Sequence, residues 1–379
     1  MNERPRLPET RAALELRRAV REWLGRYAPE GVVRVALSGG ADSLALTAAA
    51  CAEADVVDAL IVDHGLQDGS AEVADRAAAT ALGLGCRSAR VLRVQVERSA
   101  PNGAIRSVWP ADPTAAVGPT AENGSTPEDG LVPAAERAAG EEPAGSGLVG
   151  KRFPGGPEAA ARRARYDALR AAREGKPVLL GHTLDDQAET VLLGLGRGSG
   201  ARSIRGMGEY DEPWGRPLLG VRRSTTRELC ADLGLDAWED PHNSAPEFTR
   251  VRLRAEVLPL LEEVLGGGAA EALARTAAQL REDSAVLDAL AGQLLAAARA
   301  DGGLAIETLA TAEPAIRRRV IRAWLLERGA KSLTDSNLRA VEALVTRWRG
   351  QGGVAVGGSP SGTRLVAARE HGRLILGSE

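Results

Sequence analysis

The amino-acid sequence predicts an α/β protein, in which a doubly wound parallel sheet is followed by a smaller, mainly α-helical C-terminal domain. Three observations support this fold class. Apolar, strand-like runs alternate with helical segments over the first hundred residues, and the alternation resumes after a long interruption. From Glu256 onward the spacing is mainly helical and ends in short alternating segments. A chain of 379 residues is too long for one ordinary core, so we expect two domains.

The first elements are a strand, a glycine loop and a helix of small residues. Residues 32–37, VVRVAL, form the strand, and the helix begins near Ser43. A second apolar run over residues 56–62 is typical of a buried parallel strand. Helical spacing over 71–84 and alternation over 88–96 continue the same order. Sheets of this kind bind ligands at the carboxyl ends of their strands.

The periodic pattern stops between about residues 99 and 157, where Pro, Gly, Ala, Ser, Thr and Glu dominate. We predict a disordered, low-complexity insertion there, with a partner-binding segment as the alternative. Helical spacing resumes at 158–173, and a strand at 177–180 and a helix from 185 to about 195 complete the sheet. The predicted domains are a nucleotide-binding domain at 1–98 and 158–250, and a C-terminal domain at 251–379 that ends in short strands.

Composition limits the classes of function. The sequence has no apolar signal segment and no long apolar span, so we expect a cytoplasmic protein without a membrane partner. Its three cysteines are far apart and form no C-x-x-C, which argues against a disulfide framework, a zinc site or an iron–sulfur cluster. The net charge of −3 means that any nucleic-acid surface must be a local patch. The oligomeric state stays open, with a homodimer among the alternatives.

Residues 35–44, V-A-L-S-G-G-A-D-S-L, predict a site for nucleotide phosphates, because backbone N–H groups at a helix N-terminus converge on anions. The carboxylate of Asp42 beside a polyphosphate implies Mg²⁺. The loop lacks the lysine of a Walker motif, which favours cleavage of ATP between the α and β phosphates. An ordinary glycine turn is the alternative. The predicted phosphate-binding residues are Ser38, Gly39, Gly40, Ala41, Asp42 and Ser43.

Acidic residues follow two of the predicted strands. Asp63 and His64 end the second strand, where a simple polar turn is the alternative. His182, Asp186 and Glu189 are spaced by four and three, so they share one face if the helix reaches back to His182. Such a face can coordinate Mg²⁺, orient an amine or accept a proton. A solvated acidic start of a helix is the alternative.

Basic residues form two further groups. The first group follows helical spacing and consists of Glu158, Arg162, Arg165 and Tyr166. Its arginines could bind phosphates and its ring could stack on a base, and surface salt bridges are the alternative.

The second group alternates before a helix and consists of Arg250, Arg252 and Arg254, with Asn243 and Ser244 nearby. Asn243 and Ser244 could cap the helix or bind a ligand, and a solvated basic edge is the alternative.

Three separate motifs carry a family resemblance: S-G-G-A-D-S at 38–43, V-D-H-G-L at 62–66 and G-H-T-L-D-D-Q-A-E-T at 181–190. In this order they resemble the tRNA(Ile)-lysidine synthases among the PP-loop ATP pyrophosphatases, whose sheet is of the adenine nucleotide alpha hydrolase-like type. The likeness extends to nearly everything outside the insertion, through residues 157–166, 216–223 and 239–261.

The resemblance implies a specific reaction. Family members join L-lysine to C2 of the wobble cytidine in a CAU-anticodon isoleucine tRNA, through a cytidine adenylate, and release AMP and pyrophosphate. ATP and Mg²⁺ are the implied cofactors, and tRNA(Ile) and L-lysine the implied partners. The resemblance also implies that the C-terminal domain at 251–379 interacts with the tRNA. We assign catalysis to Asp42, Asp186, His182, Glu189 and Arg162. We assign Mg²⁺ to Asp42 and Asp186, cofactor binding to the loop with Asp63, and substrate binding to Glu158, Arg165, Tyr166, Asn243, Arg250 and Arg252.

Two alternatives are kept. A PP-loop tRNA thiolase would adenylate its tRNA in the same way but would use paired cysteines or a cluster, which the sequence lacks. A non-catalytic nucleotide- or RNA-binding module would not need the acidic residues of these motifs.

Overall fold

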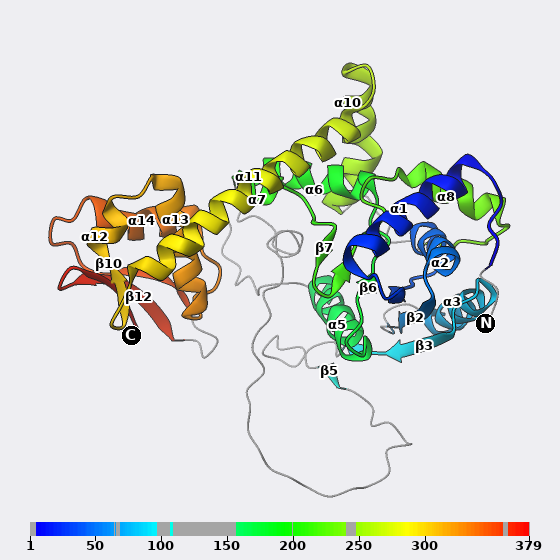
Figure 1. Cartoon of the computed structure of the whole chain (residues 1–379), viewed down its shortest axis with the longest axis horizontal. Helices are drawn as coiled ribbons and strands as arrows, with labels where there is room; N and C mark the ends of the chain where they lie inside the picture. The colour runs from blue at the N-terminus through cyan, green and yellow to red at the C-terminus, as the bar shows by residue number, and fades with distance from the viewer. Residues whose placement is uncertain are drawn as a thin grey trace, which may run out of the picture. The chain divides into compact units, whose positions relative to one another are not determined.

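The computed structural model describes residues 5–63, 65, 69–96, 107–108, 157–198, 200–239, 248–358 and 363–378. The chain divides into two compact units, Met1–Ala277 and Ala278–Glu379, and each is considered by itself (Figure 1). His64, Asn243 and Ser244, which the sequence singled out, lie outside the described residues, as do 97–106 and 109–156 of the predicted insertion. In the described part of the chain, no helix is both long and apolar enough to cross a membrane.

The first unit is built on a six-stranded sheet in the order β3-β2-β1-β6-β8-β7. Neighbouring strands run parallel except at the edge, where β7 and β8 are antiparallel. This confirms the predicted α/β class with a mixed, mostly parallel sheet. The chain reverses its direction of winding between β1 and β6, which is where such sheets bind ligands. The strands are β1 (Val32–Ala36), β2 (Val56–Asp63), β3 (Ser88–Arg93), β6 (Val178–Leu179), β7 (Tyr210–Asp211) and β8 (Trp214–Gly215).

Helices cover both faces of this sheet because alternate strand residues point to opposite sides. Ala59 and Ile61 of β2 belong to a core shared with four helices, whereas Leu60 packs with Leu169 on the other face. Figure 1 shows the first group of helices beside one another and α5 apart from them. The first group is α1 (Arg11–Tyr27), α2 (Ala41–Glu53), α3 (Ser70–Gly83) and α8 (Arg223–Asp232), and the other helices of the sheet region are α5 (Pro157–Ala172), α6 (Leu184–Gly196) and α7 (Ala201–Ile204).

Two short segments extend the first unit. Gln95–Val96 (β4) pairs with Ser107–Val108 (β5), which places a strand within the segment that we predicted as an insertion. The compact unit also continues past the boundary that we predicted at residue 250, because the following helices pack against α6 through Leu184, Ala188 and Leu258. These helices are α9 (Thr249–Arg252), the π-helical turn η2 (Leu253–Val257), α10 (Leu258–Val264) and the start of α11 (Ala269–Ala298).

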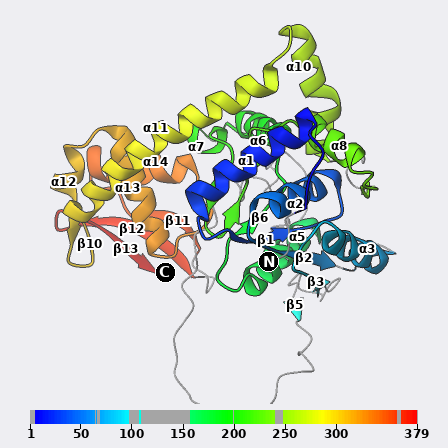
Figure 2. The same ribbon diagram turned by 45° about the vertical axis from the view of Figure 1, so that its right-hand side comes forward.

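The second unit contains a five-stranded antiparallel sheet in the order β11-β12-β13-β10-β9, with helices packed on it (Figure 2). This corrects the prediction of a mainly helical domain. Two strands, β9 and β10, are only two and three residues long, too short for a period-two pattern, and β10 pairs with β13 from the far end of the chain. The elements are β9 (Arg299–Ala300), β10 (Gly303–Ala305), α12 (Ile306–Ala310), α13 (Pro314–Glu327), α14 (Asp335–Thr346), β11 (Val354–Gly358), β12 (Arg364–Glu370) and β13 (Arg373–Ser378).

A buried ion pair ties β1 to β2. Asp58, which is 3% exposed, accepts hydrogen bonds from Arg34, Arg87 and Ser88. Burial opposes ionisation of the Asp58 carboxyl, but hydrogen bonds from Arg87 and Ser88 and the charge of Arg34 lower its pKa. In the Asp58→Ala protein, Glu174 is the acidic partner that remains for the buried Arg34 among the described residues. We expect the free energy of unfolding, measured by urea denaturation, to fall by about 3–5 kcal/mol.

The matched control for this prediction is Asp75→Ala, because Asp75 is exposed on α3. Its free energy of unfolding should stay within about 0.5 kcal/mol of the wild-type value. Equal losses in the Asp58 and Asp75 variants would show that the buried pair does not stabilise the sheet.

Candidate functional site

The predicted glycine loop connects β1 to α2. Gly39 has φ +83°, a left-handed conformation that favours glycine, and Gly40 is the N-cap of α2. The Ser43 hydroxyl accepts a hydrogen bond from the Ser38 N–H at 3.2 Å and donates to the Gly40 carbonyl at 2.9 Å. The segment after α8 also contacts the loop, since the Trp238 N–H donates to the Gly39 carbonyl at 3.0 Å. The loop is therefore held by its own hydroxyls at the N-terminus of a helix, where anions bind favourably.

Gly181 brings the loop next to the start of α6. A Cβ atom on Gly181 would lie 3.0 Å from both the Asp42 carbonyl carbon and the Ser43 nitrogen, so a side chain there would press on the backbone of the loop. Because β6 lies beside β1, the chain leaves the sheet here toward α6. The two motifs at 38–43 and 181–190 therefore meet at the carboxyl ends of the neighbouring strands β1 and β6.

Three carboxylates converge on the guanidinium of Arg223, the first residue of α8. Its nitrogens lie 2.6 Å from Asp186, 3.2 Å from Asp42 and 3.5 Å from Glu189. The Glu189 side chain is fully buried, and that of Asp186 is 12% exposed. Asp42 also accepts a hydrogen bond from the Thr226 hydroxyl. The structure thus brings together the three acidic residues that the sequence assigned to catalysis.

A second layer of arginines faces the same carboxylates. Arg254 lies 2.8 Å from Glu189 and 3.6 Å from Asp186, while Arg250 lies 4.0 Å from Glu189 and donates to the Thr190 hydroxyl at 3.2 Å. Arg252, which we assigned to substrate binding, instead forms an exposed ion pair with Glu256. The segment is helical rather than extended, so residues 250 and 254 share a face and residue 252 does not.

The surroundings shift the two aspartates in opposite directions. Burial of the Asp42 carboxyl raises its pKa against the opposing effects of Arg223 and Thr226. Burial also opposes ionisation of Asp186, but the Arg223 guanidinium and the other neighbours of Asp186 together outweigh it and lower its pKa to about 2. Asp186 is therefore a permanent anion, whereas Asp42 is the better proton acceptor.

The geometry does not fit a magnesium ion shared by Asp42 and Asp186. Both oxygens of each carboxylate are engaged, by Arg223 and Thr226 at Asp42 and by Arg223 and Thr183 at Asp186. Throughout the described ranges, no three His, Cys, Asp or Glu side chains are grouped as metal ligands. The guanidinium of Arg223 occupies the place that a shared cation would need.

His182 does not join the predicted helix face, because α6 begins at Leu184 and Thr183 caps it. Its Nδ1 atom is buried and has no hydrogen-bond partner among the described residues. Burial and the nearby positive charge of Arg216 lower the pKa of His182 to about 3, so the imidazole is neutral at physiological pH. The neutral imidazole of His182 can accept a hydrogen bond from a group bound here, but it does not supply a positive charge.

The neutral His182 predicts how stability depends on pH. A histidine unfolded in water takes up a proton near pH 6.5, whereas the buried imidazole does so only near pH 3. The stability that His182 contributes is therefore present above pH 6.5 and is lost as the pH falls toward 3. We expect the melting temperature of the wild type to drop more between pH 7 and pH 5 than that of His182→Asn.

The control for this experiment is His371→Asn, which removes an exposed histidine at a turn with positive φ. Its pH dependence should follow the wild type. If His182→Asn also follows the wild type, the imidazole is not held neutral in the folded protein.

The predicted group on α5 lies against the sheet. The Tyr166 ring packs edge-on against Trp214 at 4.8 Å, and the Arg162 and Arg165 guanidinium groups lie 5.2 and 5.7 Å from its centre. The ring is thus packed against the core, and its predicted stacking on a base stays a prediction. The side chain of Glu158 lies outside the described residues. Asp63 accepts a hydrogen bond from the Gly65 N–H at 3.0 Å, a local turn, so its cofactor role stays a prediction.

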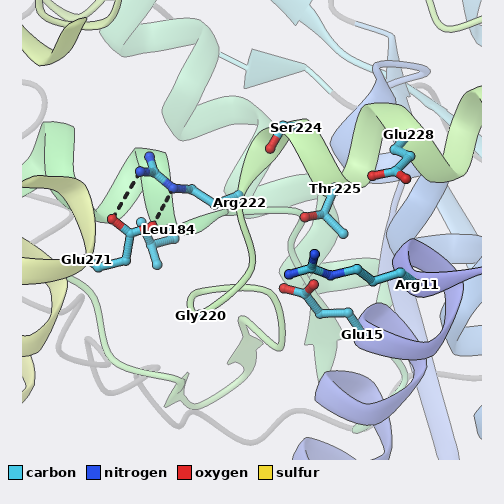
Figure 3. Close-up of a pocket in the computed structure, with 9 residues that line it drawn as sticks. All are labelled: Arg11, Glu15, Leu184, Gly220, Arg222, Ser224, Thr225, Glu228 and Glu271. Carbon is cyan, nitrogen blue, oxygen red and sulfur yellow. Dashed lines mark hydrogen bonds and ion pairs between the residues drawn. The ribbon is translucent and has the colours of Figure 1, made fainter. Parts of the chain in front are cut away.

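Arg222 and Arg223 reach to different places, and sequence reasoning missed both. Arg222 pairs with Glu271 at 2.7 Å, Glu262 at 2.9 Å and Asp185 at 3.3 Å, beside a cavity of about 460 Å³ (Figure 3). The motif at 216–223 contains both arginines, but nothing in its spacing shows which carboxylates they meet. The cavity is lined by Arg11, Glu15, Leu184, Gly220, Arg222, Ser224, Thr225, Glu228 and Glu271.

Comparisons with known proteins identify the family of this chain. A family model described as a PP-loop domain matches residues 150–261, and one described as a TilS substrate binding domain matches residues 304–375. A tRNA(Ile)-lysidine synthase of Nocardia farcinica is 62% identical over 95% of this chain and 97% of its own length. Those of Rhodococcus erythropolis and Rhodococcus opacus are 59% and 55% identical, each over 98% of this chain and 98% and 97% of their own lengths.

Proposed function

Since the chain belongs to the tRNA(Ile)-lysidine synthase family, we propose that it uses ATP to join L-lysine to C2 of cytidine 34 in a CAU-anticodon tRNA(Ile). The enzyme is an ATP-dependent ligase that modifies tRNA. The observation that carries our account of its residues is the convergence of Asp42, Asp186 and Glu189 on one cation beside the glycine loop. This arrangement suits two substrates, one that carries a polyphosphate and one that carries an ammonium group. Its tRNA substrate favours a cytoplasmic location.

In the first step, we propose that the loop at 38–43 holds the β and γ phosphates of ATP through its backbone N–H groups. Cytidine O2 attacks the α-phosphate, the bond to the β-phosphate breaks and pyrophosphate leaves. Arg223 lies within hydrogen-bond reach of Asp42, at the edge of the loop, so a bound polyphosphate would attract its guanidinium. Its departure from the three carboxylates would leave a buried anionic site that needs a new cation.

In the second step, the lysine ε-ammonium is the cation that takes this place. Asp186 and Glu189 hold it by charge, and Asp42, whose pKa burial raises, takes its proton. The neutral amine attacks C2 of the adenylated cytidine, and AMP leaves with the O2 oxygen. We propose that Mg²⁺ enters bound to the phosphates of ATP and to water, because Arg223 engages Asp42 and Asp186 until those phosphates have bound.

The thiolase alternative is disfavoured by the cysteines. Cys51, Cys86 and Cys230 are all buried, and burial raises the pKa of the Cys230 thiol to about 11. A sulfur carrier needs an accessible thiolate, which these residues do not provide.

The test is one assay with a CAU-anticodon tRNA(Ile) transcript, α-labelled ATP, Mg²⁺ and labelled lysine. We expect lysine incorporation that depends on cytidine 34, with one AMP released for each lysine added. Release of ADP, or incorporation of sulfide in place of lysine, would contradict the proposed function. Light scattering of the same sample tests the predicted alternative of a homodimer.

A further inference from the structure

We propose that Arg347, Trp348 and Arg349, supported by Arg369, form an RNA-contacting surface on the second unit, here called the tryptophan turn. The tryptophan ring would stack on an accessible base, and the two flanking arginines would bind phosphates. This inference rests on the proposed function, because it takes the RNA to be the tRNA substrate. It assigns a role to particular residues within the segment that matches the substrate binding domain.

The turn has a defined shape although it is exposed. Helix α14 ends at Thr346, and the side chain of Gln351 then bridges the turn. Its carbonyl oxygen accepts a hydrogen bond from the Arg349 N–H at 2.6 Å, and its amide nitrogen donates to the Arg347 carbonyl at 3.2 Å. Gln351 therefore holds the backbone on both sides of Trp348. A pre-formed turn loses little conformational entropy on binding a ligand.

The ring of Trp348 is presented to solvent and is supported from one side. It is 38% exposed, and the Arg369 guanidinium lies 5.5 Å from its centre. Arg369 is fixed in turn, because it donates to the Leu344 carbonyl at 3.2 Å. A guanidinium over one face of an indole leaves the other face for stacking, and exposed aromatic rings among arginines are how proteins bind unpaired bases.

The arginines of the turn differ from others in the same unit. Arg347 and Arg349 are exposed, and no carboxylate of the described residues lies within 4.0 Å of them. Six other guanidinium groups of this unit are neutralised by acidic partners, in the pairs Arg299–Glu327, Arg317–Glu342, Arg318–Glu342, Arg319–Asp288, Arg339–Asp335 and Arg373–Asp301. In a chain of net charge −3, an unneutralised basic pair beside an exposed ring fits a polyanion with aromatic groups, which is RNA.

The test measures binding of full-length tRNA to the full chain at several salt concentrations. We expect Trp348→Ala to raise Kd about tenfold and Trp348→Phe to restore most of the affinity, because any aromatic face can stack. The double variant Arg347→Glu, Arg349→Glu should also raise Kd and should lower the slope of log K against log salt by about two. The rate of lysidine formation at saturating tRNA should not change.

The matched control is the double variant Arg299→Glu, Arg339→Glu, which changes the net charge equally at arginines that already have acidic partners. Its Kd should rise much less. An unchanged Kd for Trp348→Ala, or equal effects of the two double variants on Kd, would overturn the proposal that this turn contacts the tRNA. A wild type that binds tRNA through this turn but makes no lysidine would refute the proposed function and leave the surface standing.

Discussion

Replacing Asp42 by Asn is expected to lower the rate of lysidine formation at saturating lysine and tRNA by about 10²–10⁴-fold. Burial raises the pKa of Asp42, whereas that of Asp186 is lowered, so Asp42 is the better proton acceptor of these two carboxylates. Asparagine keeps the size of the side chain and an oxygen that can accept the Thr226 hydrogen bond. The loss should therefore appear in kcat, with a smaller change in the KM for lysine.

The control is Asp75→Asn, the same substitution at an exposed position of α3. Its kcat should equal that of the wild type. If Asp42→Asn keeps more than about a tenth of the wild-type kcat, the proton goes to another acceptor, since general-base catalysis contributes about a hundredfold or more.

Replacing Asp186 by Asn is expected to raise the KM for lysine by about 10- to 100-fold. The pKa of Asp186 is lowered to about 2 by Arg223 and its other neighbours against the effect of burial, so it contributes a fixed negative charge. A hydrogen bond to a charged group is worth about 1.5–3 kcal/mol, which corresponds to this change. Asparagine keeps an oxygen for the Thr183 N–H that caps α6, so the fold should be retained.

Steady-state kinetics over a range of lysine concentrations separates the two aspartates. Our account predicts that Asp42→Asn mainly lowers kcat and that Asp186→Asn mainly raises the KM for lysine. Asp167→Asn, at an exposed position of α5, should change neither. If the two effects are exchanged, Asp186 is the proton acceptor and Asp42 the charge that holds the substrate.

The loop and the sheet around it could be predicted from the sequence because their information is local. A run of apolar residues, two glycines and a helix of small residues occur within residues 32–53, and the structure places β1, the loop and α2 there. The meeting of Asp42 with Asp186 and Glu189 followed from a general rule, since ligands bind at the carboxyl ends of parallel strands.

The arginines of the site could not be assigned in the same way. Arg223 contacts Asp42 across 181 positions of the chain, and its neighbour Arg222 turns to other carboxylates. Both residues are charged and adjacent, so periodicity does not distinguish them. The helical turns of α9 and η2 bring Arg254 to Glu189 and leave Arg252 paired with Glu256, so the substrate-binding role of Arg252 stays a prediction.

The short strands that end the chain were predicted, but the two further strands of the second sheet were missed for a related reason. Strands β9 and β10 hold at most three residues each, and β10 pairs with β13 at the other end of the unit. Such pairing depends on contacts distant in sequence, which side-chain periodicity does not record.

A crystal structure of the protein with Mg²⁺ and an ATP analogue whose α,β-bridge is a methylene group tests the phosphate site and the movement of Arg223 most directly. We expect the β and γ phosphates to lie within hydrogen-bond distance of backbone N–H groups of residues 39–43, with the Arg223 guanidinium moved from Asp186 onto a phosphate. Phosphates bound elsewhere, with Arg223 still 2.6 Å from Asp186, would contradict it.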